Sequence, residues 1–147
     1  MIILKKILCP VDHSECSYFA LKYAISLALK DEAKLYLMHV IDTRIYDTEI
    51  YPFSPYKPSE TDLSKTHENL IKSLPEGTTD VLKVETIVIN GIPFQEIIKT
   101  ATEINADLIV IGTHGRTGIP HIMMGSVAEK VVRGAPCPVL TARTPTP

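Results

Sequence analysis

Short apolar runs alternate with amphipathic stretches along this chain of 147 residues. The apolar runs are rich in isoleucine, leucine and valine, which is typical of strands buried in a sheet. The amphipathic stretches repeat their apolar positions at spacings of three and four, which predicts helices. Strands are expected at residues 2–11, 35–41, 81–89, 108–111 and 138–142, and helices at residues 15–28, 60–74, 93–101 and 126–133.

The first strand and the first helix illustrate the pattern. Lys5 and Lys6 interrupt the apolar run of residues 2–11, where the chain is expected to enter from solvent. Ser14 or Asp12 is expected to cap the helix that follows, because both side chains accept hydrogen bonds from first-turn amides. This helix of about four turns should bury one apolar stripe, formed by Cys16, Phe19, Ala20, Tyr23, Ala24, Leu27 and Ala28.

Prolines separate or begin the later elements. Residues 42–59 contain Pro52, Pro55 and Pro58 without any periodic pattern, which predicts a long mobile loop. Pro93 suits the first position of a helix. Residues 81–89 alternate enough to form a strand near the edge of the sheet. The helix at residues 126–133 is expected to bury its three valines: Val127, Val131 and Val132.

Strand and helix alternate throughout, and no repeat or linker divides the chain, so a single domain over residues 1–147 is expected. The expected fold class is α/β, with an open, mostly parallel sheet and helices on both faces. Ligands bind such sheets beyond the carboxyl ends of the strands, where the strand order reverses. The loop of residues 10–12 and the loop after residue 111 are the candidates for this crevice. If their two strands are neighbours, a carboxylate faces a phosphate cradle, which suits a nucleotide.

The second of these loops is rich in glycine. Gly112, Gly115 and Gly118 follow the strand, and the pair Gly125-Ser126 opens the last helix. Glycine at a strand end allows a positive φ angle and a close approach of ligand to backbone amides. A helix start offers free N–H donors and the positive end of the helix dipole. The order of these residues predicts a phosphate cradle, whereas the structural alternative is a turn made by glycines alone.

Composition and charge exclude several classes of protein. Fifteen basic residues oppose seventeen acidic ones, giving a net charge of −2, which argues against binding to nucleic acid or to a membrane surface. No apolar run approaches the roughly 20 residues of a membrane span, and the N-terminal residues do not form a signal peptide. Cys9, Cys16 and Cys137 form no paired framework and fit a reducing cytoplasm, with the thiols acting as small buried hydrophobes.

With these residues identified, the chain resembles the universal stress protein family over its whole length. The resemblance rests on Ile7–Asp12, on Gly112–Gly118, on Gly125–Val131 and on Ala135–Leu140. The ATP-binding branch of that family carries the motif G-x2-G-x9-G-[ST]. Gly112, Gly115 and the Gly125-Ser126 pair satisfy this motif without a gap.

The resemblance implies a Rossmann-like fold with the strand order 3-2-1-4-5 and a bound ATP, ADP or AMP. It implies that Asp12 binds the ribose or adenine side, and that Arg116 adds a charge to the phosphate clamp. It also implies a homodimer formed through the last strand, residues 138–143. The implied adenine slot comprises Pro10, Val11 and the backbone of Val40, and the implied phosphate contacts are Gly112, Gly115, Gly125, Ser126 and Val127.

One departure from the family pattern concerns residues 119–124. Family members often carry basic residues between the third and fourth glycines, whereas this chain has Ile-Pro-His-Ile-Met-Met. Fewer cations there should weaken binding of a triphosphate relative to a monophosphate.

Other functional signals are weaker. His39, His114 and His121 match no zinc spacing, so loop or hydrogen-bonded core histidines are expected, and any metal should be Mg²⁺ or Mn²⁺ bound through the phosphates. Asp12 could also be a helix cap or, in a receiver-like fold, a phosphate acceptor, but the acidic cluster and later lysine of a receiver are missing.

No residue is assigned a catalytic role, since no lysine of a phosphate-binding loop follows the glycines and Ser126 is a donor rather than a base. A nucleotide-binding regulatory protein is therefore the favoured interpretation. The alternatives are a slow ATP-hydrolysing switch and a dimeric scaffold or chaperone-like module with a structural nucleotide.

Overall fold

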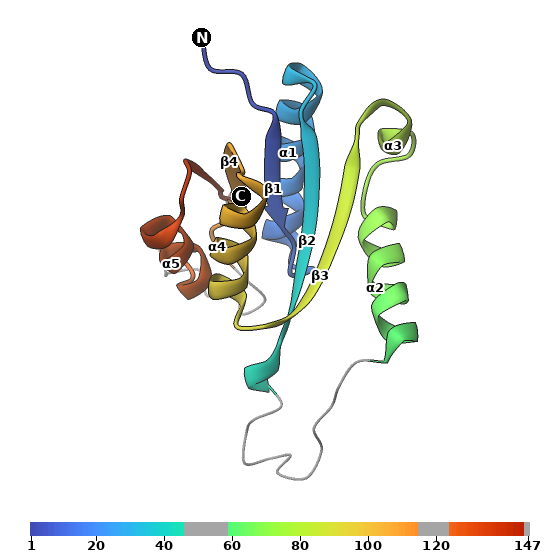
Figure 1. Ribbon diagram of the computed structural model, residues 1–147, viewed down its shortest axis with the longest axis vertical. Coiled ribbons are helices and arrows are strands. Elements are labelled where there is room, and N and C mark those ends of the chain that lie inside the picture. The colour runs from blue at the N-terminus through green and yellow to red at the C-terminus, as the bar shows by residue number, and fades with distance from the viewer. Residues whose placement is uncertain (46–58, 115–123, 146–147) are drawn as a thin grey trace.

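A computed structural model describes residues 1–45, 59–114 and 124–145 of the chain. Five parallel strands form one sheet in the order β3-β2-β1-β4-β5 (Figure 1), so the α/β fold and the strand order expected from the sequence are confirmed. The strands are β1 (Lys6–Pro10), β2 (Lys34–Asp42), β3 (Val84–Gly91), β4 (Leu108–Gly112) and β5 (Val139–Ala142).

Helices cover both faces of this sheet. The helices are α1 (Glu15–Asp31), η1 (Thr43–Ile45), α2 (Glu60–Lys72), α3 (Thr78–Val81), α4 (Pro93–Ile104) and α5 (Ser126–Gly134). Buried residues of α1 and α2 pack on one face of the sheet, and buried residues of α4 and α5 pack on the other. In Figure 1, α4 and α5 lie together beside the β4 end of the sheet, and α2 lies beside β3. Pro93 is at the start of α4, as expected.

The core has two layers because successive side chains of a strand point to opposite faces. Ile7 and Cys9 of β1 pack toward α1, whereas Leu8 between them packs toward α4 and α5. Leu35 and Leu37 of β2 pack on the same face as Ile7 and Cys9. All five residues have no exposed surface. Burial on both faces explains why these central strands read as continuous apolar runs rather than as alternating ones.

The expected first strand was too long at its N-terminal end. Residues 2–4 lie outside the sheet, and Ile2 and Ile3 are 88% and 60% exposed. β1 begins only at Lys6, because its partner β2 begins at Lys34 in the same register. Asp107 accepts hydrogen bonds from the amides of Lys5 and Lys6, so this carboxylate holds the chain where it enters the sheet.

The expected third strand also began too early. Thr78–Val81 form the short helix α3, and the side chain of Val81 is 71% exposed. Gly77 precedes this helix with a φ angle of +81°, and the Thr78 hydroxyl donates to the carbonyl of Pro75. β3 starts at Val84 and lies at the edge of the sheet, where the sequence placed it.

The buried faces of two helices differ from the expected ones. In α1, Tyr23 is 47% exposed, while Ser17, Leu21 and Ile25 are buried. The helix is turned toward α2, so that Leu21 and Ile25 belong to the same cluster as Leu70 and Leu74. In α5 the buried residues are Ala128 and Val131, whereas Val132 is 46% exposed.

Candidate functional site

β1 and β4 are neighbours in the sheet, with Ile7 paired to Leu108 and Leu8 paired to Ile109. β1 lies between β2 and β4, so the strand order reverses at this point. The segments that leave the carboxyl ends of β1 and β4 therefore start side by side. This position is the ligand crevice of open parallel sheets.

The segment after β1 is held firmly to the neighbouring strand. Val11 is 2% exposed, and its amide donates to the carbonyl of Met38 at 2.7 Å. The Oδ1 atom of Asp12 accepts a hydrogen bond from the amide of Ser14 at 2.9 Å. Ser14 is the N-cap of α1, since its hydroxyl accepts from the amide of Ser17. Of the two capping residues considered, Ser14 is the cap, and Asp12 instead braces the turn.

The segment after β4 returns to the start of α5. The amide of Thr113 donates to the carbonyl of Ala142 on β5 at 2.9 Å, and the carbonyl of Thr113 accepts from the amide of Gly125 at 2.5 Å. Gly125 is the N-cap of α5 and has no side chain that could cap the first-turn amides. The N-terminus of α5 therefore lies beside the end of β4, one strand from Asp12.

The glycines of this region differ from expectation in one respect. The φ angle of Gly112 is not positive, and the φ angle of Gly125 is −67°. A Cβ atom on Gly112 would lie 2.9 Å from the backbone carbon and oxygen of Cys16. The described structure thus requires glycine at 112 for the close packing of α1 on β4, not for an unusual backbone conformation.

Replacing Gly112 by alanine should lower the free energy of unfolding by about 1–3 kcal/mol, because rigid backbone must move to make room. Gly134→Ala is the matched control, since its Cβ would meet the Cδ1 atom of Ile98, a side-chain end that can rotate. Urea unfolding of both variants measures the difference. Equal stability of the two variants would contradict this packing role.

Some of the remaining predicted site residues lie in the described part of the structure, and the others lie outside it. Pro10 is buried and pairs with Met38, and Val40 is half-buried on the α4 and α5 face. Ser126 is exposed at the first position of α5, and Val127 is half-buried against the core. Gly115 and Arg116, together with Gly118, His121 and most of residues 42–59, lie outside the described residues.

The profile of the universal stress protein family matches residues 4–143. The chain belongs to this family. A universal stress protein of Methanocaldococcus jannaschii is 36% identical over 151 residues, which cover 97% of this chain and 84% of that protein. A putative universal stress protein of Staphylococcus aureus strain USA300 is 40% identical over 149 residues, which cover 98% of this chain and 87% of that protein.

The fold of this universal stress protein is also found in solved structures. The structure of the hypothetical protein MJ0577 superposes with a TM-score of 0.82 at 32% identity, covering 99% of this chain and all of that one. More distant universal stress proteins have been solved in complex with cAMP and, from Archaeoglobus fulgidus, with dAMP. Their TM-scores are 0.70 and 0.66, and at 21% and 23% identity these two show the fold alone.

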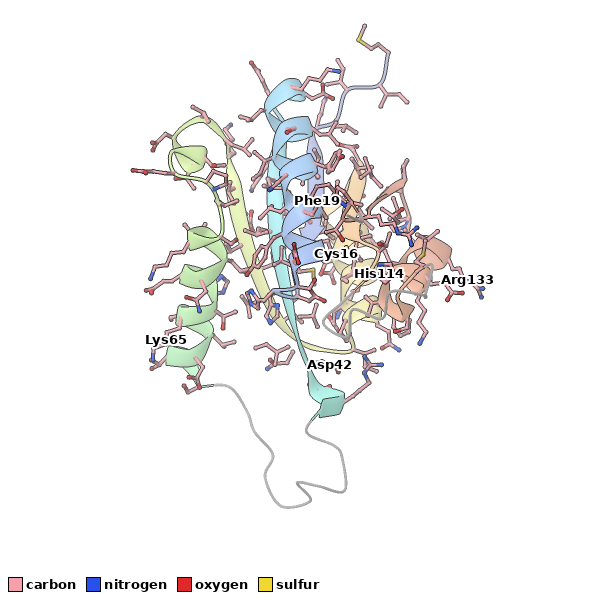
Figure 2. All side chains as sticks on the ribbon, turned by 180° about the vertical axis from the view of Figure 1, so that it is seen from behind. Cys16, Phe19, Asp42, Lys65, His114 and Arg133 are labelled. Carbon is pink, nitrogen blue, oxygen red and sulfur yellow. The ribbon has the colours of Figure 1, made fainter. Side chains whose placement is uncertain are left out.

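Cys16 and His114, both labelled in Figure 2, are linked through Thr113 at the end of β4, and neither was a predicted site residue. The Cys16 thiol donates to the carbonyl of Ala142 at 3.3 Å and lies 3.9 Å from the Thr113 hydroxyl, which is 2.9 Å from Nδ1 of His114. This network ties α1, β4 and β5 together beside the crevice. The sequence carried no signal for it, because its partners lie about 100 to 130 positions apart.

Two of the three cysteines are buried, as the sequence indicated, and the third is only partly buried. Cys9 and Cys16 are buried, Cys137 is half-buried, and all three are free thiols. Burial raises the pKa of the Cys9 thiol to about 12. Burial and, secondarily, the charge of Asp107 also raise the pKa of Cys137. Since the thiolate is the reactive form, neither thiol is prepared for nucleophilic chemistry.

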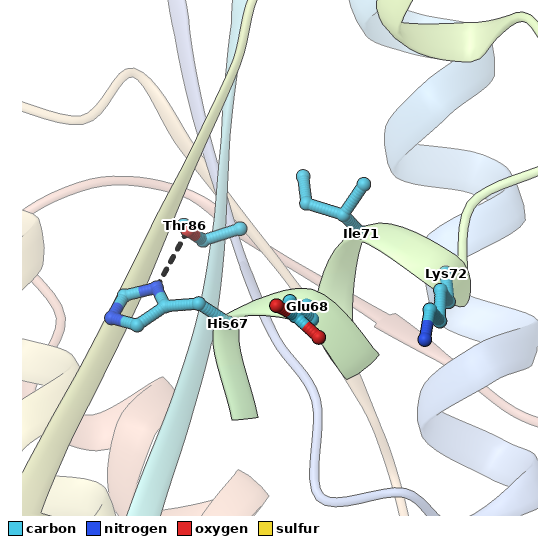
Figure 3. Close-up of a pocket in the computed structure, with 5 residues that line it drawn as sticks. All are labelled: His67, Glu68, Ile71, Lys72 and Thr86. Atoms are coloured by element: carbon cyan, nitrogen blue, oxygen red, sulfur yellow. Dashed lines mark hydrogen bonds between the residues drawn. The ribbon is translucent and has the colours of Figure 1, made fainter. Parts of the chain in front are cut away.

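A separate open hollow lies between α2 and β3 (Figure 3). His67, Glu68, Ile71, Lys72 and Thr86 line it. The Nδ1 atom of His67 is 2.7 Å from the Thr86 hydroxyl, so this histidine is hydrogen-bonded within the fold. None of the site residues predicted from the sequence lines this hollow.

Among residues 1–45, 59–114 and 124–145, no helix is long and apolar enough to cross a membrane.

Proposed function

We propose that this universal stress protein binds an adenine nucleotide and acts as a regulatory protein rather than as an efficient enzyme. The observation that carries the proposal is the meeting of two segments at the ends of β1 and β4. One segment supplies the carboxylate of Asp12, and the other leads to the N-terminus of α5 at Gly125, an N-cap residue that has no side chain. A carboxylate suits ribose hydroxyls, and helix N-terminal amides suit phosphates. The complexes of distant family members with cAMP and dAMP support the same ligand class.

Each predicted contact then has a chemical role in the proposal. Pro10, Val11 and Val40 form the adenine side, and Asp12 binds the ribose. The phosphates bind the amides that follow Gly125, the hydroxyl of Ser126 and, from outside the described residues, Gly115 and Arg116. Mg²⁺ or Mn²⁺ would be held through the phosphate oxygens. The polar groups among these contacts are hydrogen-bond donors and one carboxylate. We therefore propose that hydrolysis of bound ATP is slow or incidental. Measuring the release of phosphate over hours tests this.

Asp12→Ala should weaken the binding of ATP by about 1–3 kcal/mol, the usual cost of a lost charged hydrogen bond. Inorganic triphosphate has no ribose, so its affinity should not change, which makes it the matched ligand control. Calorimetric titration of both ligands into both proteins gives the four affinities. Equal loss for ATP and triphosphate would place Asp12 at the phosphates, and no loss for either would exclude it from the site.

The charge of the residues on the phosphate side of the crevice determines which nucleotide we expect the protein to prefer. Residues 119–124 carry no lysine or arginine. We propose that AMP and ADP therefore compete well with ATP, and titration of all three with and without Mg²⁺ ranks them.

We also propose a homodimer formed through β5. β5 is the edge strand beside β4, and Val139, Leu140 and Thr141 are only half-buried. Leu140 packs on the same core as Phe19 of α1, which stacks edge-on against the exposed Tyr23 at 5.4 Å between ring centroids. An apolar strand edge that pairs with no other described strand is suited to pairing with a second copy.

Sedimentation should show a dimer for the unmodified protein, and Leu140→Pro should give monomers or insoluble chain, because proline removes a backbone donor and distorts the strand. Thr141→Lys is a milder variant that places a charge on the edge without removing a backbone donor. It should give a soluble monomer with an unchanged far-UV circular dichroism spectrum. A dimer of unchanged strength in Thr141→Lys would place the interface elsewhere.

A further inference from the structure

Two histidine rings pack together next to Asp12. The ring of His13, on the loop after β1, lies 4.6 Å from the ring of His39 on β2, measured between centroids, with 40° between the ring planes. His39 is 8% exposed, whereas His13 lies near the surface. The sequence indicated a loop or hydrogen-bonded core histidine at position 39 and gave no signal for a role of His13.

His39 fixes the backbone at the end of β1. Its Nδ1 atom is 2.7 Å from the carbonyl oxygen of Val11, and a carbonyl only accepts hydrogen bonds, so Nδ1 carries the proton. The amide of the same residue, Val11, donates to the carbonyl of Met38. Two consecutive residues of β2 therefore hold Val11 on both sides, and Asp12 follows directly.

His13 is held in a costly backbone conformation. Its φ angle is +66°, a region that few residues other than glycine adopt and that costs about 1 kcal/mol or more. On its other side the Nδ1 atom of His13 is 2.8 Å from the Tyr18 hydroxyl of α1. The ring thus bridges α1 and β2 across the loop that carries Asp12.

Protonation of both rings would place two positive charges within this stack. Histidine ordinarily changes charge between about pH 5 and 8, and like charges so close repel each other. Among the residues that the structure describes, Asp12 precedes His13 on the loop, and the Tyr18 hydroxyl of α1 is bonded to the His13 ring. β3 places the apolar Val88 in register with His39, and α2 contributes His67, which is bonded to Thr86. Further along β2, Asp42 is paired with Arg44.

We propose that the His13–His39 pair is a proton-sensitive positioning element that sets the backbone of Val11 and Asp12 and weakens nucleotide binding at acid pH. Above the titration of the pair, the stacked rings hold Asp12 toward the crevice. Below it, repulsion separates the rings and releases the Val11 carbonyl from its donor. The effect on nucleotide binding rests on the proposed function, whereas the effect on the backbone does not.

His13→Asn is the decisive variant, because asparagine tolerates a positive φ angle but does not titrate. His67→Asn is the matched control, since it removes a hydrogen-bonded histidine from α2, away from the Asp12 loop. The affinity for ATP is measured for all three proteins between pH 8 and pH 5.5, and each variant is compared with the unmodified protein at the same pH. The titration of ATP itself cancels in this ratio.

The unmodified protein should lose about tenfold more affinity than His13→Asn over this range, which corresponds to roughly one pK unit of linkage. His67→Asn should follow the unmodified protein. A His13→Asn affinity that differs by the same factor at every pH would mean a merely structural role and would overturn the proposal.

Nuclear magnetic resonance of the ligand-free protein separates this proposal from the proposed function. The rings of His13 and His39 should titrate in two separated steps, and the backbone amides of Val11 and Asp12 should shift with them. In His13→Asn the His39 ring should titrate in one step at higher pH. If ATP fails to bind at any pH while the amide chemical shifts of Val11 and Asp12 change with the titration of the rings, the proposed function fails and the positioning element stands. Amide chemical shifts that do not change as the rings titrate would refute the positioning element.

Discussion

Replacing Gly125 by valine is expected to abolish nucleotide binding while leaving the fold intact. Gly125 has φ and ψ angles of −67° and 157°, which valine adopts without strain, and its amide can still donate to Thr113. The branched side chain, however, would stand at the N-terminus of α5, where the phosphates are proposed to bind. We expect affinity to fall at least about 100-fold, equivalent to about 2.7 kcal/mol.

Gly125→Ala is the control for this experiment. Valine and alanine are both poor N-cap residues, so the two variants should lose similar stability, about 1 kcal/mol or less relative to glycine. They differ in bulk, so alanine should weaken ATP binding far less than valine. Calorimetric titration gives the affinities, and far-UV circular dichroism with thermal unfolding confirms the fold. Wild-type affinity in Gly125→Val would mean that the phosphates do not approach α5.

Leu37→Ala should cost about 2–5 kcal/mol of unfolding free energy, the cost usual for truncating a fully buried leucine. Leu37 has no exposed surface, lies on the inner strand β2 between Cys9 of β1 and Thr86 of β3, and belongs to the core cluster under α1 and α2. Its truncation leaves a cavity that neighbours on two strands and two helices cannot fill.

Leu29→Ala is the matched control, because Leu29 is 44% exposed on α1. Its truncation should change stability by less than about 1 kcal/mol, since alanine is an excellent helix former and little burial is lost. Urea unfolding followed by circular dichroism compares the two variants. A difference below about 1 kcal/mol between them would contradict the two-layer core described above.

The architecture could be predicted from the sequence because strand and helix signals alternate and each has its own period. β1, β2 and β4 are buried on both faces, so their apolar runs stand out without any tertiary information. The errors lie where local pattern and tertiary context disagree. Residues 2–4 have an apolar strand-like sequence but lie before the start of β2 and pair with no described strand, and the amide of Leu4 donates instead to the carboxylate of Asp31. Val81 looks like the start of a strand, yet the turn at Gly77 and the Thr78 hydroxyl bond close a helical turn instead.

The candidate site could be predicted only in part. The sequence placed Asp12 after the first strand and Gly125 at the start of the last helix, and the family resemblance implied that the first and fourth strands are neighbours. It could not assign Gly112 its packing contact with Cys16, which depends on how closely α1 approaches β4. Nor could it find the stack of His13 on His39, because the two residues lie 26 positions apart and meet only when β1 and β2 pair. Contacts of this kind need the folded register.

The central claim is that the crevice between β1 and β4 holds an adenine nucleotide. The most direct test is mass spectrometry of the small molecules released when freshly purified protein is denatured, followed by thermal unfolding with added ATP, ADP and AMP. We expect an adenine nucleotide to be released in near-stoichiometric amount, or at least one of the three to raise the melting temperature of the emptied protein. No released nucleotide and no thermal shift with any of the three would contradict it.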